Sequence, residues 1–318
     1  MFHRPAAFPC IFMAFDIFLY VETEAACGQP YYKSSVLVSH HFGNRISNGT
    51  EAKPHSHPWQ VFIVTTIGEE QRMCGGSLID WKNSNASDLV LTAAHCILNR
   101  KQLKAEYTTK VPLFVRIWRE FFNKPHSYIE NDALAMKLTQ IKVYLGAHDS
   151  TIFEPTVQEL LATEVLFYSM ESEMSFDDIA LLVLERKVKY TNFIQGICLP
   201  SEDEYLPDQH SRCMVTGWGK TGEDKRMAKK LQEIEVELID TPFCNHFVNT
   251  ETMFCAGSTR KNVGICQGDS GSPLVCHVNG KFTVYGVMSF TTLRECSNEE
   301  DLAVFMKIPA FVSWIKES

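Results

Sequence analysis

The sequence lacks two features that would direct it to a membrane or to nucleic acid. It contains no run of the roughly 18 apolar residues that cross a bilayer. Basic residues are in the minority, with 30 Lys and Arg against 38 Asp and Glu, and the formal net charge is -8. Because phosphate binding needs a concentrated basic surface, we expect no nucleic-acid partner. Because the long apolar run is missing, we expect no membrane partner.

Internal repeats, low-complexity tracts and Cys-x-x-Cys pairs are also absent, although the 318 residues include 11 cysteines. The missing Cys-x-x-Cys spacing argues against a zinc site, since structural zinc is commonly bound by such pairs. Many cysteines without metal-ligand spacing are typical of chains that fold in an oxidising compartment. The cysteine content therefore predicts a secreted, extracellular protein with disulfide bonds.

One long apolar stretch is present, at the N-terminus. It covers residues 6–21, follows a basic residue and is followed by small residues of the kind that a signal peptidase recognises. Asp16 interrupts it, which leaves a disordered N-terminus as the alternative. We predict a signal peptide over residues 1–26. Its removal would take Cys10 and leave ten cysteines, an even number.

The next segment, residues 27–45, is polar, rich in serine and histidine and without periodicity. Such a composition predicts a propeptide or a linker. Two glycosylation sequons begin at Asn48 and Asn85. They fit a glycoprotein on the secretory route.

The remainder of the chain alternates short β-type runs with clusters of Gly, Asn and Asp. The runs cover residues 60–66, 89–91, 140–145, 179–184, 214–218, 233–239, 283–290 and 303–308. Many short strands broken by turn residues predict an all-β barrel or sandwich. Phe311, Trp314 and Ile315 recur at helical spacing, so residues 308–318 should form a helix that packs one face on the body.

Three short segments carry chemistry. They are Thr-Ala-Ala-His-Cys around His95, Asp-Asp-Ile-Ala-Leu-Leu around Asp178, and Gly-Asp-Ser-Gly-Ser-Pro around Ser270. Taken alone, each has a structural reading, as a core histidine, a strand cap and a turn. Together, in the order His, Asp, Ser and with a Thr-Gly-Trp-Gly segment, they resemble the chymotrypsin-like serine protease family. The resemblance covers residues 46–318 apart from one insertion.

This resemblance implies two packed six-stranded antiparallel β-barrels with a C-terminal helix, and hydrolysis through an acyl-enzyme. A serine hydroxyl is a poor nucleophile at neutral pH, so a base must accept its proton. The resemblance makes Ser270 the nucleophile and His95 the base, with Asp178 orienting the imidazole. The N–H groups of Gly268 and Ser270 would form the oxyanion hole. Ser272 departs from the family, which has glycine there, and we expect its small side chain to fit.

The resemblance also implies activation by cleavage between Arg45 and Ile46, which would make residues 27–45 a propeptide and 46–318 the protease domain. Ser47 and Asn48 replace the usual valine and glycine. In the family the new N-terminal ammonium pairs with the acid beside the catalytic serine, here Asp269. The alternative is that the junction is only a boundary between polar and apolar sequence.

The family's disulfide pattern maps onto ten cysteines of this chain. It implies Cys74–Cys96, Cys213–Cys276, Cys244–Cys255 and Cys266–Cys296, with Cys27–Cys198 tethering the propeptide. Sequence alone could not choose this connectivity.

The family's primary specificity pocket maps onto Gly264, Ile265, Ser289, Phe290, Thr291 and Ala303. Gly264 stands where trypsin-like members have an aspartate, and a buried guanidinium without a counter-charge would be strongly disfavoured. Thr291 and Ala303 replace glycines of the open chymotrypsin pocket. The pattern looks most like the pancreatic elastases, and it predicts cleavage after small or medium aliphatic residues.

One stretch does not fit the family. His95 and Asp178 are 83 positions apart (178 − 95), where relatives need roughly half that. The extra residues fall at about 103–135. Between Pro112, which could begin a helix, and Pro125, which could end one, apolar residues recur every fourth position. We hypothesise an amphipathic helix beside the site. The alternative is a poorly ordered insertion or sequence retained by a faulty gene model.

Other functional classes fit less well. A non-catalytic protease homologue, acting as a binding or regulatory module, would normally have lost a triad member. An α/β-hydrolase esterase needs Gly-x-Ser-x-Gly and the order Ser, Asp, His. The pairs His40–His41 and His55–His57 fall in polar loops without the carboxylate spacing of a metal hydrolase. Ala147 stands where calcium-binding relatives often supply an acid. We therefore predict no metal and no cofactor, a monomer, and as partners protein or peptide substrates, an activating protease and protease inhibitors.

Overall fold

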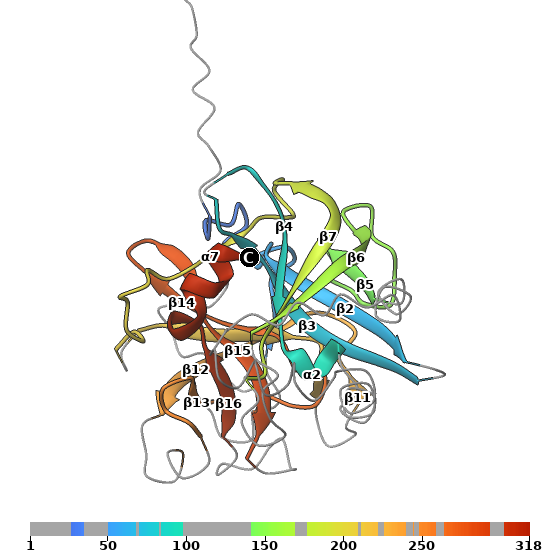
Figure 1. The fold of residues 1–318 in the computed structure, drawn as a ribbon. Helices are drawn as coiled ribbons and strands as arrows, with labels where there is room; N and C mark the ends of the chain where they lie inside the picture. The colour runs from blue at the N-terminus through green and yellow to red at the C-terminus, as the bar shows by residue number, and fades with distance from the viewer. Residues whose placement is uncertain are drawn as a thin grey trace, which may run out of the picture.

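The computed structural model describes residues 27–34, 50–67, 70–82, 84–97, 141–168, 177–208, 211–221, 226–239, 244, 248–258, 264–292 and 302–318. Strands dominate these ranges, and two groups of them lie one on each side of the molecule (Figure 1). None of the helices in this part of the chain has the length and apolar character needed to span a bilayer.

The first group of strands closes into a six-stranded antiparallel barrel. The pairing runs β3-β2-β5-β6-β7-β4 and returns from β4 to β3. The strands are β2 (Gln60–Ile67), β3 (Glu70–Asp80), β4 (Ala86–Thr92), β5 (Ile141–Leu145), β6 (Gln158–Phe167) and β7 (Ala180–Lys189).

The second group closes in the same way, in the order β14-β9-β12-β13-β16-β15 and back to β14. Its strands are β9 (Cys213–Gly217), β12 (Gln232–Ile239), β13 (Met253–Ser258), β14 (Pro273–Val278), β15 (Lys281–Thr291) and β16 (Ala303–Lys307). Strand β8 (Ile197–Cys198) joins the barrels by pairing in parallel with β3 and β15. The predicted fold class, two antiparallel barrels of the chymotrypsin type, is confirmed.

The remaining elements are short. They are β1 (Thr50–Glu51), which pairs with β12, the hairpin β10 (Lys220–Thr221) and β11 (Arg226–Met227), the helix α2 (Ala94–Ile97), and the C-terminal η1 (Ile308–Phe311) and α7 (Val312–Glu317). The predicted C-terminal helix is thus present as a 3-10 turn followed by an α-helix. Its side chains at Phe311, Trp314 and Ile315 are buried, as the helical spacing predicted. Tyr168, at the end of β6, packs against the first two of them, so the C-terminus reaches back to the first barrel.

Alternation of apolar and polar residues explains most of these strands. In β5, Ile141, Val143 and Leu145 point into the barrel, while Lys142 and Tyr144 point outward. Each of the eight predicted runs falls on a strand of the structure. Strands β3, β6, β13 and β14 were not predicted. Gly75 and Gly76 weaken the β signal of β3, Pro273 begins β14, and β6 is rich in helix-forming residues.

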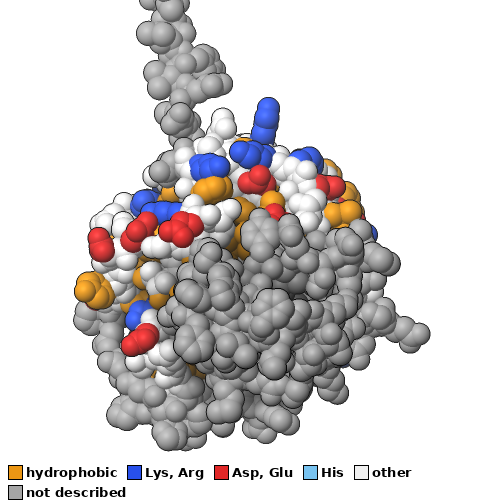
Figure 2. Space-filling view, viewed as in Figure 1, with side chains coloured by type: hydrophobic (Ala, Val, Ile, Leu, Met, Phe, Trp, Pro, Cys, Tyr) orange, Lys and Arg blue, Asp and Glu red, His pale blue; other side chains and the backbone are white. Residues whose placement is uncertain are grey.

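Charge is mixed on the described part of the face drawn in Figure 2. Basic and acidic side chains are interspersed there rather than gathered by sign. On that face the described surface offers no single-sign patch of the kind that steers a highly charged partner.

Candidate active site

His95 and Asp178 are brought together by strand pairing. His95 lies in α2, directly after β4, and Asp178 lies two residues before β7. Strands β4 and β7 are antiparallel neighbours, and Thr92 at the end of one faces Ala180 at the start of the other. This register places the two segments side by side although 83 positions separate the two residues.

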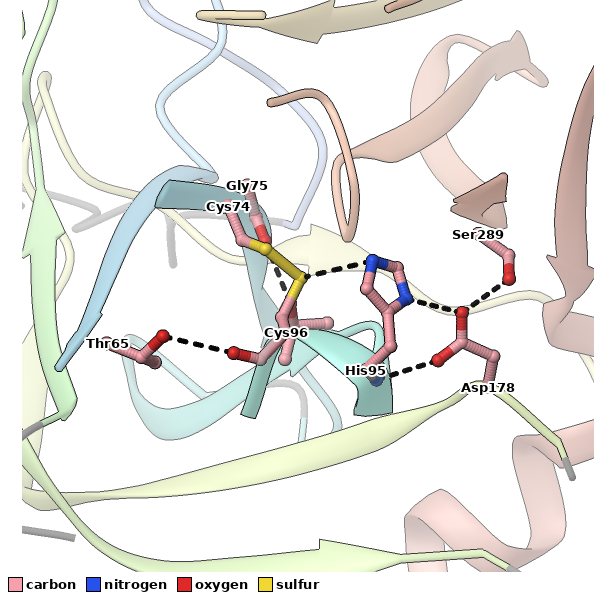
Figure 3. Close-up of a disulfide and its surroundings, with 8 residues drawn as sticks. Thr65, Cys74, Gly75, His95, Cys96, Asp178 and Ser289 are labelled. Atoms are coloured by element: carbon pink, nitrogen blue, oxygen red, sulfur yellow. Dashed lines mark hydrogen bonds and ion pairs between the residues drawn. A yellow bond between two sulfur atoms is a disulfide. The ribbon is translucent and has the colours of Figure 1, made fainter. Parts of the chain in front are cut away.

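Two hydrogen bonds link the pair. The backbone N–H of His95 donates to Asp178 Oδ1 over 2.8 Å, and Nδ1 of the ring lies 2.7 Å from Oδ2 (Figure 3). With an ionised carboxylate, the ring nitrogen that faces Asp178 must carry a proton. The other ring nitrogen, Nε2, points away from Asp178. The imidazole side chain is 33% exposed against 8% for the carboxylate, and Nε2 lies 3.9 Å from Cys96 Sγ of the Cys74–Cys96 disulfide (Figure 3).

The environment of Asp178 favours its charged form. Burial alone would raise its pKa. Hydrogen bonds from His95 and from the Ser289 hydroxyl, together with the charge of His95, outweigh burial and hold the pKa of Asp178 below its ordinary value. Ser289 belongs to β15 of the second barrel, so the carboxylate is held by both barrels. Ser289, assigned from the sequence to the specificity pocket, thus lies beside Asp178 (Figure 3).

The Ser270 loop lies against the same region. Gly75 of β3 donates its N–H to the Ser270 carbonyl over 2.8 Å, and the Gly271 N–H donates to Met288 of β15 over 2.8 Å. A Cβ on Gly271 would lie 2.3 Å from Thr92 Oγ1, just before the helix that carries His95. The loop therefore fits between β3, the end of β4 and β15, and it brings Ser270 to the junction where His95 and Asp178 meet.

Two glycines let this loop turn sharply. Gly268 has φ +101° and Gly271 has φ +79°, both in the left-handed region that side chains disfavour. Within the loop, Asp269 donates its N–H to the Cys266 carbonyl, and Ser272 donates to the Asp269 carbonyl. The backbone is thus fixed by its own hydrogen bonds on either side of Ser270.

Asp269 is buried beneath the loop. Its carboxylate accepts the backbone N–H of Gly219 over 2.8 Å and that of Cys266 over 3.0 Å. Burial raises the pKa of Asp269 to about 6, although these two N–H groups oppose the rise. Sequence reasoning placed this acid beside the serine. Its burial, and hence its raised pKa, became visible only in the folded chain.

The stability of the uncleaved chain should therefore depend on pH through Asp269. A folded pKa above the unfolded value means that the folded state binds more protons between about pH 4 and pH 6. We expect the free energy of unfolding to fall by about 3 kcal/mol as pH rises through this window, compared with an Asp269→Asn variant. The measurement is the urea midpoint at pH 4, 5, 6 and 7 of the Arg45→Gln protein, which should stay uncleaved, with and without Asp269→Asn. A parallel pH profile for both proteins would contradict this role.

Ser272, where the family has glycine, is accommodated by two other glycines. Its side chain is fully buried. Its Oγ lies 2.0 Å from the point where a Cβ on Gly75 would sit and 3.1 Å from that point on Gly217. The missing side chains at these two positions leave the space that the hydroxymethyl group fills. The expectation that a small side chain fits here agrees with this packing.

Because Gly75 and Ser272 share this space, a substitution at one position should compensate for a substitution at the other. Gly75→Ala should destabilise the fold by about 1–3 kcal/mol, because the new methyl would overlap Ser272 Oγ in a close-packed interior. Ser272→Gly in the same chain should recover a large part of that loss. Urea midpoints of the two single variants and the double variant give the coupling. Additive effects would show that the two side chains do not compete for this space.

The predicted pocket residues lie at the end of β15, at the start of β16 and just before the Ser270 loop. Thr291 and Ala303 face each other across the β15–β16 pair. Ile265 and Ala303 are buried in one apolar cluster, and Phe290 is 42% exposed. Gly264 is half-buried. The predicted wall residues therefore lie on neighbouring segments, and Ile265 and Ala303 among them are buried and apolar.

Met288 belongs to the same apolar cluster as Ile265 and Ala303. Sequence reasoning missed it. It lies one residue before Ser289, where only the strand pairing of β15 shows which way its side chain points.

Four of the implied disulfides are bonded in the structure: Cys27–Cys198, Cys74–Cys96, Cys213–Cys276 and Cys244–Cys255. Cys266 is also disulfide-bonded, and its implied partner Cys296 lies outside the described residues. In the described part of the chain, one group has metal-ligand atoms close together: Cys74, His95 and Cys96. Because both sulfurs are joined in a disulfide, they are not available as thiolate ligands.

Several predicted features lie outside the described residues. They are Arg45, Ile46, the Asn48 sequon and the insertion at 103–135. Asn85, the other sequon, is exposed at the edge of the first barrel. His57 was expected in a polar loop without the carboxylate spacing of a metal site. In the structure it is buried, and its Nε2 lies 2.8 Å from Glu233 on β12 of the second barrel.

Two closed six-stranded barrels with a histidine, an aspartate and a serine gathered at their junction define the class of chymotrypsin-like serine proteases. A family model described as Trypsin matches residues 46–114 and 131–315, and the chain belongs to this family. The unmatched residues 115–130 fall within the predicted insertion. The chain is a serine endopeptidase.

Two curated relatives are similar along most of their length. Granzyme M of Rattus norvegicus is 30% identical over 295 residues, which are 90% of this chain and 93% of the relative. Chymotrypsin-like elastase family member 1 of Homo sapiens is 30% identical over 277 residues, which are 85% of this chain and 91% of the relative.

Proposed function

We propose that the chain is a secreted zymogen which, after cleavage behind Arg45, hydrolyses peptide bonds that follow small or medium aliphatic residues. The observation that carries the catalytic part is the His95–Asp178 pair, held by two hydrogen bonds with the Ser270 loop packed beside it. The disulfides favour an oxidising compartment, and with it secretion.

In this mechanism Ser270 Oγ attacks the substrate carbonyl as His95 accepts the hydroxyl proton. The new C–O bond gives a tetrahedral intermediate, whose oxyanion would be held by the N–H groups of Gly268 and Ser270. The C–N bond then breaks, and His95 returns the proton to the leaving amine. Water hydrolyses the resulting ester by the same steps in reverse. Asp178 keeps the imidazole oriented and balances its charge, which its lowered pKa suits it to do.

Activation would act through Asp269. A buried carboxylate without a cation is costly, and an ammonium freed at Ile46 would supply one. The raised pKa of Asp269, about 6, supports this, because the carboxylate needs a charged partner to be ionised there at neutral pH. A separate proposal concerns the insertion at 103–135. It would form an amphipathic helix beside the site and alter the rate of cleavage of folded protein substrates.

Serine-reactive labelling tests the proposal. We expect a fluorophosphonate to label the secreted protein slowly before cleavage and at least about a hundredfold faster after cleavage behind Arg45, because the oxyanion hole then forms. The label should map to Ser270 by mass spectrometry. An Arg45→Gln variant, which resists the activating protease, is the matched control. A cleaved protein that never reacts would identify a non-catalytic homologue instead.

A further inference from the structure

Glu233 is a carboxylate buried between the barrels, away from the catalytic residues. It lies on β12 and is 2% exposed. Two groups meet at its Oε2: His57 Nε2, over 2.8 Å, and the Ser34 hydroxyl, which donates over 2.8 Å. Ser34 is fully buried and His57 is 3% exposed. We call these three side chains the Glu233 cluster.

The cluster joins three segments that are far apart in sequence. Ser34 belongs to residues 27–34, the described part of the predicted propeptide 27–45, and His57 to the loop before β2 of the first barrel. Glu233 belongs to the second barrel, 199 positions from Ser34 and 176 from His57. A buried carboxylate is strongly destabilising when a partner is removed. Removal of the Ser34 hydroxyl is therefore expected to destabilise the contact between these segments.

The other end of this segment is fixed separately. Cys27 is bonded to Cys198, and the Gly28 backbone donates to Gly196 over 3.1 Å and accepts from Phe282 over 2.8 Å. Gly28 has φ +65°, and a Cβ there would lie 2.0 Å from the Phe282 carbonyl. Residues 27–34 are thus attached at both ends, by a disulfide and backbone pairing at one end and by the Glu233 cluster at the other.

Glu233 also fixes the chain on the far side of the proposed cleavage site. In the pairing of β1 with β12, Thr50 lies opposite Glu233. Ser34 is the last described residue before Arg45, and Thr50 is the first after it. Both flanks of the Arg45–Ile46 bond are therefore anchored at one residue. Cutting the bond leaves each product with its own attachment to Glu233.

We propose that the Glu233 cluster retains the cleaved propeptide noncovalently, as a light chain of the activated enzyme, in addition to the Cys27–Cys198 tether that the family resemblance implies. The inference rests on the proposed cleavage behind Arg45. The Ser34 hydroxyl is a positioning group. It donates to the same carboxylate oxygen that His57 contacts, and so helps to hold β12 and the His57 loop together.

The test removes the disulfide and leaves the cluster. A Cys27→Ser/Cys198→Ser protein is cleaved behind Arg45, and the products are separated by native gel filtration and identified by mass spectrometry. We expect the light chain to elute with the protease domain. Adding Ser34→Ala should weaken its retention at least tenfold, whereas Lys33→Ala, at an exposed neighbour, should not.

A second measurement works without cleavage. In the Arg45→Gln protein with its disulfide intact, Ser34→Ala should lower the urea midpoint relative to Lys33→Ala. Loss of the light chain when Ser34 is intact, or equal retention and equal midpoints for the two alanine variants, would overturn the inference. If protease treatment yields no protein that begins at Ile46, the proposed activation is wrong. The role of Ser34 is then still decided by the urea midpoints of Ser34→Ala and Lys33→Ala in the uncleaved Arg45→Gln protein.

Discussion

Ser270→Ala should abolish peptide hydrolysis while the protein still folds and is secreted. The substitution removes one hydroxyl, and with it the atom that forms the covalent bond to the substrate. The loss of kcat should reach at least about 10⁴-fold, as expected when a covalent nucleophile is deleted and only binding and oxyanion stabilisation remain. Turnover of an aliphatic peptide substrate by the cleaved protein is the measurement.

Ser272→Ala is the matched control for this variant. It makes the same substitution two positions away, at a buried hydroxyl that has no hydrogen-bond partner among the described residues. Its removal breaks no described bond, and turnover should stay within about threefold of the wild type, in keeping with a ΔΔG below about 0.7 kcal/mol. Substantial hydrolysis by the Ser270→Ala protein would mean that another residue is the nucleophile.

The second large effect concerns the residue before the cleaved bond. Peptides with Ala, Val or Leu at this position should be cleaved at least about a hundredfold faster, in kcat/KM, than peptides with Arg or Lys. The ratio corresponds to about 2.7 kcal/mol, which an unpaired buried cation easily costs. The apolar cluster with Ile265 and Ala303, and Thr291 opposite Ala303, support this preference.

A charge placed on the pocket floor tests the physical reason. Gly264→Asp should narrow the ratio between aliphatic and basic substrates by supplying a counter-charge. Gly264→Asn has nearly the same shape without the charge and should leave the ratio in favour of aliphatic residues. If the unmodified enzyme prefers Arg or Lys, Gly264 does not form the floor of the pocket.

The candidate triad residues and the strand content could be proposed from the sequence because they depend on local patterns. The alternation in β5 repeats over two residues, and the segments around His95, Asp178 and Ser270 are short and contiguous. The disulfide pairing came only through the resemblance to a family. Strand β3 escaped prediction because its glycines have low strand propensity, and only its pairing with β2 and β4 makes it a strand.

Tertiary structure decided what depends on contacts between distant segments. The fit of Ser272 required the space left by Gly75 and Gly217, and the raised pKa of Asp269 required its burial. The Glu233 cluster joins residues up to 199 positions apart, and no local pattern marks such a contact. The sequence by itself determined which groups could do the chemistry, because reactivity follows from residue type. Only the closed barrels determined which groups meet, because strand register over long separations sets their distances.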